Sequence, residues 1–337
     1  MFTKTHTRIA LAAAATVFSL AAHAANSIQF DPFGTSGTSA KYEVDSLDWL
    51  PNNALAIGAL STPALGSAAF TALGLTAQPG QRVGESYFRT VSQGKLSSFH
   101  DAATDNDVST LSGFGREFTF QTSFYEFATA IGSATASFRQ APGASYFRIF
   151  ADTASNSNTT TGAFYGDGVP IFQGTLTEVS GAFTTKTFVP ADPDFGKYKL
   201  LDSFGSDQQH GVKSVIGQGS NHITVSNITV DSRYFLSRVT NYIDTTNLNT
   251  PFEQTNPSDQ VVGVTPSYSL RAGVPTNGEA CPTGTGKDEN GNVIARCDFH
   301  FQSDASGSFL APEPGSIALI GIALAGLGFA NRKRKLV

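Results

Sequence analysis

Apolar and polar residues alternate with a period of two over many short stretches of this chain, and this pattern constrains the fold most. In Glu117–Phe124 the phenylalanines fall on one face, and Tyr146–Phe150 follows the turn Ala141-Pro142-Gly143. Residues 223–230 also alternate, with a phase slip at Ser226-Asn227 that predicts a bulge or tight turn. Such alternation is typical of strands with one buried face. Strands of about five to eight residues between turn residues predict an all-β body, a β-sandwich or jelly roll.

Composition supports strands over helices. The chain has 33 Gly, 27 Phe and one Met, and only 15% of its residues are charged. Trp49–Gln81 has no charged residue, but prolines interrupt it, so we expect a core strand pair or short helix there instead of a membrane span. Residues 297–301 alternate after Asn290-Gly291, a hairpin signal. Residues 151–168 are rich in Ser, Asn, Thr and Gly and predict an exposed loop.

The N-terminus has the three parts of a secretory signal peptide. Lys4 and Arg8 carry positive charge, Ile9–Ala22 is uncharged and apolar, and Ala22-His23-Ala24 places small residues where signal peptidase recognises them. The apolar run of about 14 residues is shorter than the ~20 that a membrane span needs. We therefore expect residues 1–24 to form a signal helix that signal peptidase removes between Ala24 and Ala25.

The C-terminus has a second short apolar segment. Residues 317–330 contain only Ile, Ala, Leu, Gly and Phe, and a basic cluster of Arg332, Lys333, Arg334 and Lys335 follows. A hydrophobic helix of this length is short for a hydrocarbon core of ~30 Å. The basic cluster is expected to stay in the cytoplasm, so the rest of the chain would lie across the membrane. A simple tail anchor does not explain why Pro312-Glu313-Pro314 comes directly before this segment.

This order of a Pro-Glu-Pro triplet, a short apolar helix and a basic terminus resembles the PEP-CTERM sorting domain, over residues 312–337. The resemblance implies processing near the triplet by an exosortase, a membrane protease with a catalytic cysteine. It also implies tethering at the inner membrane in transit and a final place at the cell surface or outside the cell. Ile171–Leu176 and Phe299–Asp304 are similar to a subgroup of this family that includes flocculation-associated proteins. The expected organisation is a signal peptide over 1–24, an all-β domain over 25–303, a polar connector over 304–311 and the sorting tail over 312–337.

The body between the two terminal signals is acidic. Of 22 Lys and Arg, two lie in the signal peptide and four in the tail, and of 27 Asp and Glu only one lies in the tail, so residues 25–311 carry a formal charge of −10. This charge argues against nucleic acid as a partner. Cys281 and Cys297 are the only cysteines, and an exported protein with an even number predicts a disulfide between them. Closing this loop of about 15 residues would contribute about 3 kcal/mol.

No catalytic, metal-binding or cofactor-binding motif is evident, so we expect no enzyme and no cofactor. The four histidines of the body, at positions 100, 210, 222 and 300, lack metal-site spacing, and no GxSxG sequence occurs. Gly34–Ser39 and Gly217–Ser220 lack the lysine of a phosphate loop and are predicted to be ordinary loops.

Three acidic clusters remain as candidates. Asp105 with Asp107, and Asp192 with Asp194, are close pairs, but a glycosidase needs two carboxylates that face each other across a cleft. Asp288–Asn292 imitates the start of a calcium loop, although Val293 and Phe299 stand where the Gly and Glu of that loop belong. A polar hairpin tip explains it better.

The sequence therefore predicts an exported cell-surface or extracellular-matrix protein with a structural or adhesive role, with biofilm exopolysaccharide as its candidate partner. The alternative is a secreted hydrolase that acts on polysaccharide. A concave cleft with two convergent carboxylates would favour the hydrolase, and a flat sandwich with solvated loops would favour the matrix protein.

Overall fold

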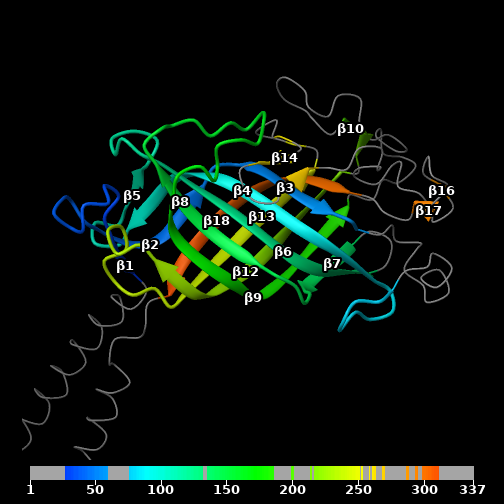
Figure 1. The fold of residues 1–337 in the computed structure, drawn as a ribbon. Coiled ribbons are helices and arrows are strands. Elements are labelled where there is room, and N and C mark those ends of the chain that lie inside the picture. The colour runs from blue at the N-terminus through cyan, green and yellow to red at the C-terminus, as the bar shows by residue number, and fades with distance from the viewer. Residues whose placement is uncertain are drawn as a thin grey trace, which may run out of the picture.

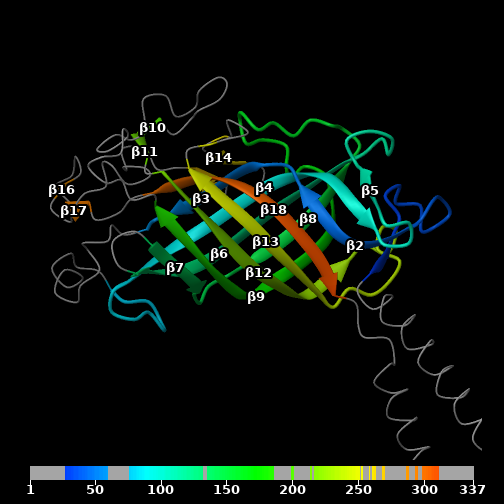
Figure 2. The same ribbon diagram turned by 180° about the vertical axis from the view of Figure 1, so that it is seen from behind.

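The computed structural model describes residues 27–59, 76–131, 135–185, 216–250 and 298–310, with short pieces at 199–200, 213–214, 252, 258, 260–262, 268–269, 286–287 and 293–294. Figures 1 and 2 show these residues from opposite sides. The described part of the chain is built of strands and turns and contains no helix. The prediction of an all-β body is confirmed.

The strands differ widely in length. The longest are β4 and β9 with 17 residues each, β6 with 15 and β12 with 14. Their bounds, in chain order, are β1 Ile28–Phe30, β2 Tyr42–Trp49, β3 Asn52–Ile57, β4 Glu85–Asp101, β5 Asn106–Ser109, β6 Glu117–Ile131, β7 Thr135–Gln140, β8 Tyr146–Asp152, β9 Val169–Thr185, β10 Lys199–Leu200, β11 Lys213–Ser214, β12 Gly217–Val230, β13 Asn241–Thr250, β14 Gln260–Val261, β15 Tyr268–Ser269, β16 Gly286–Lys287, β17 Val293–Ile294 and β18 Phe299–Leu310.

The long strands form one antiparallel sheet whose pairing closes on itself (Figure 1). Strand β4 pairs with β6, and β6 pairs with β7 and β8, which follow each other along it. Both of these pair with β9, and the order continues through β12, β13 and β18. Strand β18 pairs with β2 and β3, which lie one after the other along β4 and complete the ring.

This closed sheet corrects the predicted sandwich or jelly roll. The alternating pattern shows which face of a strand is buried, but it does not show which strands are neighbours. Strands β4 and β6, with 17 and 15 residues, are about twice as long as the longest predicted strands, because each runs past two shorter strands in succession. Continuous pairing along these long strands leaves the ring without the two separate sheets that a sandwich requires.

The predicted connector over 304–311 is also corrected. Residues 304–310 form the second half of β18, where Ala305 and Phe309 are buried and the register with β13 continues to Leu310. The alternation of small and polar residues in this segment looked like a solvated linker in the sequence. Its small inward-facing residues are instead required by packing, since a Cβ on Gly307 would collide with the ring and hydroxyl of Tyr242.

Other local predictions have mixed outcomes. The bulge predicted at Ser226-Asn227 is confirmed by register shifts between β12 and β9 and by a φ of 52° at Asn227. Gly217–Ser220 was predicted to be a loop but lies in β12, where its glycines allow close contact with β9. Trp49–Gln81 contributes the end of β2 and all of β3, while its residues 60–75 lie outside the described part. Of the exposed loop predicted over 151–168, residues 153–168 do run as an irregular loop, whereas 151 and 152 belong to β8 and Tyr165 is buried.

Side chains on the inner face fill one half of the closed sheet. A core of buried residues there is rich in phenylalanine and includes Phe30, Phe118, Phe172 and Phe309. The rings meet edge-on or tilted, as in the pair Phe30 and Phe118 with centroids 5.7 Å apart. A gap of about 10 Å³ lies among these side chains. This half forms the well-packed end of the molecule.

Candidate ligand cavity inside the closed sheet

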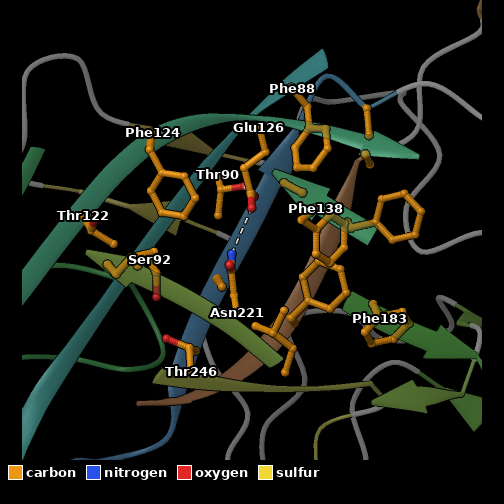
Figure 3. A pocket seen from close by; sticks show the side chains of 18 of the residues that line it. Phe88, Thr90, Ser92, Thr122, Phe124, Glu126, Phe138, Phe183, Asn221 and Thr246 are labelled. Carbon is orange, nitrogen blue, oxygen red and sulfur yellow. Dashed lines mark hydrogen bonds between the residues drawn. The ribbon is translucent and has the colours of Figure 1, made fainter. Parts of the chain in front are cut away.

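The other half of the interior holds a cavity of about 150 Å³ (Figure 3). Inner-face side chains of β3, β4, β6, β7, β12, β13 and β18 line it, among others. Much of its wall is phenylalanine, including Phe88, Phe124, Phe138 and Phe183. Phe138 and Ala128 are only half-buried, so the cavity reaches toward the end of the sheet that β7 forms.

Small side chains account for the empty space. Strand β3 contributes Ala54 and Ala56 to the wall, and Ala128 on β6 and Ala136 on β7 also line it. An unfilled volume in a protein core destabilises the fold by about 24 cal/mol per Å³, so a cavity of this size corresponds to about 3 to 4 kcal/mol. The fold tolerates this loss in one half of its interior while it packs the other half tightly.

Glu126 places a carboxyl group in this apolar surrounding. Its side chain comes from β6, follows Phe120, Thr122 and Phe124 on the same face, and is 2% exposed. Asn221 Nδ2 on β12 donates a hydrogen bond of 2.9 Å to Glu126 Oε1, which Figure 3 shows, and the Thr90 hydroxyl on β4 donates to Oε2. Burial raises the pKa of Glu126 to about 7, although both hydrogen bonds oppose this change.

A second buried carboxyl group, Asp244 on β13, lines the same cavity and is 1% exposed. Thr246 Oγ1 donates to Asp244 Oδ1 at 3.2 Å, and the Tyr242 hydroxyl lies 3.5 Å from Oδ2. That hydroxyl also accepts a hydrogen bond of 3.0 Å from Trp49 Nε1. Burial raises the pKa of Asp244 to about 7. A chain of hydrogen bonds therefore links the cavity to Trp49, the only tryptophan of the protein.

Only one end of the Asn221 side-chain amide is hydrogen-bonded. Its Nδ2 binds Glu126, but its buried Oδ1 has no hydrogen-bond partner. This oxygen lies above Gly181, the residue of β9 that pairs with Asn221 and brings no side chain to the interior. No Lys, Arg or His occurs among the described residues that line the cavity. Its polar groups are therefore carboxyl, amide and hydroxyl groups, with hydrogen-bond acceptors in excess.

A comparison with protein families matches residues 310–335 to the PEP-CTERM protein-sorting motif. The chain carries this sorting motif. The resemblance of the C-terminus is thus confirmed, and the PEP-CTERM motif implies an exported protein that is sorted through its C-terminal tail and processed by an exosortase. Searches among curated proteins and among solved structures found no match.

The PEP-CTERM motif begins at Leu310, the last residue of β18. The residues expected to act in sorting and processing lie outside the described part: Pro312, Glu313, Pro314, Arg332, Lys333, Arg334, Lys335, Ala24, Ala25, Cys281 and Cys297. In the described residues, no helix is long and apolar enough to span a membrane.

Of the three acidic clusters singled out in the sequence, only the pair Asp105 and Asp107 lies in the described residues. Asp105 and Asp107 lie at the surface beside His100, whose Nδ1 is 2.9 Å from Asp45 and whose Nε2 is 3.4 Å from Asp105. The Asp45 hydrogen bond raises the pKa of His100. No group of three ligating side chains fit for a metal ion occurs among the described residues. Asp192, Asp194 and the calcium-like segment 288–292 lie outside them.

Gly34–Ser39 is a loop, as predicted, and it is organised from within. The carboxylate of Asp31 accepts backbone hydrogen bonds of 2.9 Å from Phe33, Thr35 and Gly37. Together with a hydrogen bond from the Thr35 hydroxyl, they lower the pKa of Asp31 against the opposing effect of burial. Because the N–H groups already bind an internal anion, the loop does not present them to a phosphate.

Sequence reasoning missed both cavity acids. A signal for Glu126 was present, because it continues the inward series of Phe120, Thr122 and Phe124 at the same spacing of two. A charged residue on the apolar face of a long strand indicates a buried carboxyl group. The sequence indicates a buried Asp244 less clearly, because Tyr242 and Thr246, which share its face of the strand, also carry hydroxyl groups. The convergence of the two acids on one cavity depends on sheet closure, which the sequence pattern does not reveal.

Proposed function

We propose that the exported body is a non-catalytic, structural or adhesive component of the cell surface or extracellular matrix, with exopolysaccharide as its partner. The observation that carries this proposal is the PEP-CTERM motif, which starts where the closing strand of the sheet ends. A closed sheet is a rigid unit without open edges. Such a unit, followed directly by a sorting tail, suits a protein whose task is to be displayed.

The outer wall supports the choice of partner. Tyr87 on β4 stacks on Tyr125 of β6, with ring centroids 5.0 Å apart and an interplanar angle of 4°. The Arg89 guanidinium lies 4.2 Å from the centre of the Tyr125 ring. On neighbouring β8, Arg148 lies 4.5 Å from the ring of Tyr146. All five side chains are half-buried, and together they form what we call the tyrosine platform.

The chemistry of the tyrosine platform fits a polysaccharide. Tyrosine rings combine an apolar face with a polar edge, which matches the mixed surface of a sugar ring. The Arg89 guanidinium already donates hydrogen bonds to Ser123, Tyr125 and Tyr268 and holds the platform together. The Arg148 guanidinium is the group offered to acidic substituents on the polymer, because guanidinium groups bind carboxylates in a planar, bidentate manner. The platform therefore gives an acidic body a local surface for an acidic polymer.

Cell cohesion and polymer retention test this proposal. Deletion of the gene should reduce cell aggregation and biofilm, and the wild-type gene should restore both. A Tyr87→Ala variant should be exported normally but restore them poorly. Phe164→Ala, which removes an aromatic ring that is 49% exposed in the loop 153–168, is the matched control and should restore them fully. Unchanged cohesion after deletion would refute the adhesive role.

Processing is part of the same proposal. Signal peptidase would cut between Ala24 and Ala25, exosortase would cut near Pro312, and Cys281 would form a disulfide with Cys297. The chain would be tethered at the inner membrane in transit through its C-terminal helix. Mass spectrometry of the exported protein should find termini near these positions, and non-reducing peptide mapping should find the joined cysteines. An intact Val337 in mature protein would count against cleavage of the tail.

The hydrolase alternative has one observation in its favour, since Glu126 and Asp244 line one cavity. However, a glycosidase holds its carboxylates in a wet cleft that admits a sugar chain. This cavity lies inside the closed sheet, measures only about 150 Å³ and has mostly apolar walls. Release of reducing sugar from exopolysaccharide by the wild type, but not by Glu126→Gln, would favour the hydrolase.

A further inference from the structure

The cavity is built as a polar site inside an apolar chamber. Glu126 and Asn221 are 2% and 6% exposed, and a hydrogen bond of 2.9 Å joins them. They come from β6 and β12, on different walls of the closed sheet. A buried carboxyl group that faces empty apolar space weakens the fold, and so does a buried amide oxygen without a partner. Both features would be relieved by a bound molecule with hydrogen-bond donors.

The acceptors near Glu126 converge on a small region. The carboxyl group of Glu126 lies between the Thr90 hydroxyl and the Asn221 amide, each of which already donates to it. The remaining lone pairs of Glu126, Asn221 Oδ1 and Thr90 Oγ1 can accept further hydrogen bonds. An ammonium group supplies three N–H donors and no acceptor. It is the group that best matches an acidic site with acceptors in excess.

The walls determine the rest of the ligand. Phe88, Phe124 and Phe138 surround the polar site (Figure 3), so the body of the ligand must be apolar. Aromatic rings also attract a neighbouring cation through their electron-rich faces. A cavity of 150 Å³ can hold a molecule of about the size of benzene. A single aromatic ring or a short alkyl chain therefore fits.

We propose that the cavity binds a small hydrophobic amine in its ammonium form, with the charge at Glu126 and Asn221 and the apolar body among the phenylalanines. Asp244 lines the same cavity from β13, the strand that pairs with the β12 of Asn221, and adds a second carboxyl group to the field that attracts the cation. This site is separate from the tyrosine platform on the outer wall. The inference therefore stands or falls independently of the surface role.

Benzylamine, with toluene as its neutral counterpart of similar shape, tests the proposal on the purified exported protein. The fluorescence of Trp49 provides the readout. The centroid of its ring lies 4.8 Å from that of Phe120 in the cavity wall, and hydrogen bonds through Tyr242 link it to Asp244. Titration at pH 8, checked by calorimetry, should show saturable binding of benzylamine at least tenfold tighter than that of toluene. Equal affinities, or no saturable binding of benzylamine, would overturn the proposal.

Variants separate charge recognition from shape. Glu126→Gln should lose the preference for benzylamine but still bind toluene, which shows that the cavity is intact. Glu178→Gln, which neutralises an exposed carboxylate on β9, is the matched control and should keep the preference. Ala56→Leu fills the cavity and should weaken both ligands. A preference for benzylamine that survives in Glu126→Gln would refute the role of this carboxyl group.

A measurement on the wild type gives an independent check. Glu126 and Asp244 are the titratable groups among the described residues that line the cavity. Lowering the pH from 8 to 5 protonates both carboxyl groups and leaves benzylamine charged, so its affinity should fall at least tenfold while that of toluene stays constant. An amine affinity that does not change with pH would contradict binding at a carboxylate.

Discussion

Replacing Glu126 with glutamine should make the protein more stable in mildly alkaline solution. Burial raises the pKa of Glu126 from 4.5 to about 7, and this difference corresponds to about 3 kcal/mol. Because the folded pKa is the higher one, the contribution of this group to stability is complete below pH 4.5 and is lost as the pH rises through about 7. The wild type should therefore lose about 2 to 3 kcal/mol through Glu126 alone between pH 5 and pH 8. Glutamine stays neutral, so this part of the loss should be absent.

Urea unfolding followed by Trp49 fluorescence measures the effect, since this buried residue is the only tryptophan. The free energy of unfolding should be compared at pH 5 and pH 8 for the wild type, Glu126→Gln and Glu178→Gln. The exposed control should follow the wild type, and Glu126→Gln should show a smaller decrease by about 2 kcal/mol. Some pH dependence should remain, because Asp244 is also buried with a raised pKa. Parallel pH profiles for wild type and Glu126→Gln would refute the assignment of Glu126 as a buried titrating group.

Two further substitutions test the wall of the sheet. Gly307→Ala should lower the free energy of unfolding by about 1 to 3 kcal/mol, because the added methyl group would collide with Tyr242. The control Ser308→Ala, on the exposed face of the same strand, should change it by less than about 0.5 kcal/mol. Equal effects of the two substitutions would show that the wall can shift. Arg139→Ala should lower it by about 2 to 4 kcal/mol at pH 7, because Glu85 is buried and its pKa is lowered by the Arg139 hydrogen bonds despite burial. That loss should shrink as the pH falls through the lowered pKa of Glu85, and urea unfolding at pH 7 and pH 3 would show whether it does.

The sequence predicts the strands well because the alternation of apolar and polar residues shows directly which face of a strand is buried. The inward phenylalanines of β6 and the bulge at Asn227 follow from residues close together in the chain. Partners of strands depend on contacts between distant residues. The contact between β18 and β3, for example, joins Phe301 to Ala54. Nothing near Ala54 in the sequence indicates this neighbour, so the closed sheet could not be predicted.

The candidate site was harder to predict than the fold. Its acids have no motif, because they act through burial and not through spacing. The carboxyl of Glu126 becomes distinctive only when β12 brings Asn221 beside it and small residues such as Ala56 leave a cavity open. Sorting is the opposite case, since a protease must recognise a linear segment, and such a signal is complete in the sequence itself.

The position of β18 affects the order in which this protein can fold. It fills the gap between β13 and the β2–β3 pair, so the ring closes only after the last strand of the body has crossed the membrane. The carbonyl oxygen of Leu310 accepts a hydrogen bond of 2.6 Å from the Thr240 hydroxyl, which fastens the end of the strand. Under the membrane tethering proposed above, the tail would keep this strand close to its gap while long-range pairing, the slow step of such topologies, takes place. Cleavage before closure would release a body with two open edges, so on this proposal late cleavage would protect the body against aggregation.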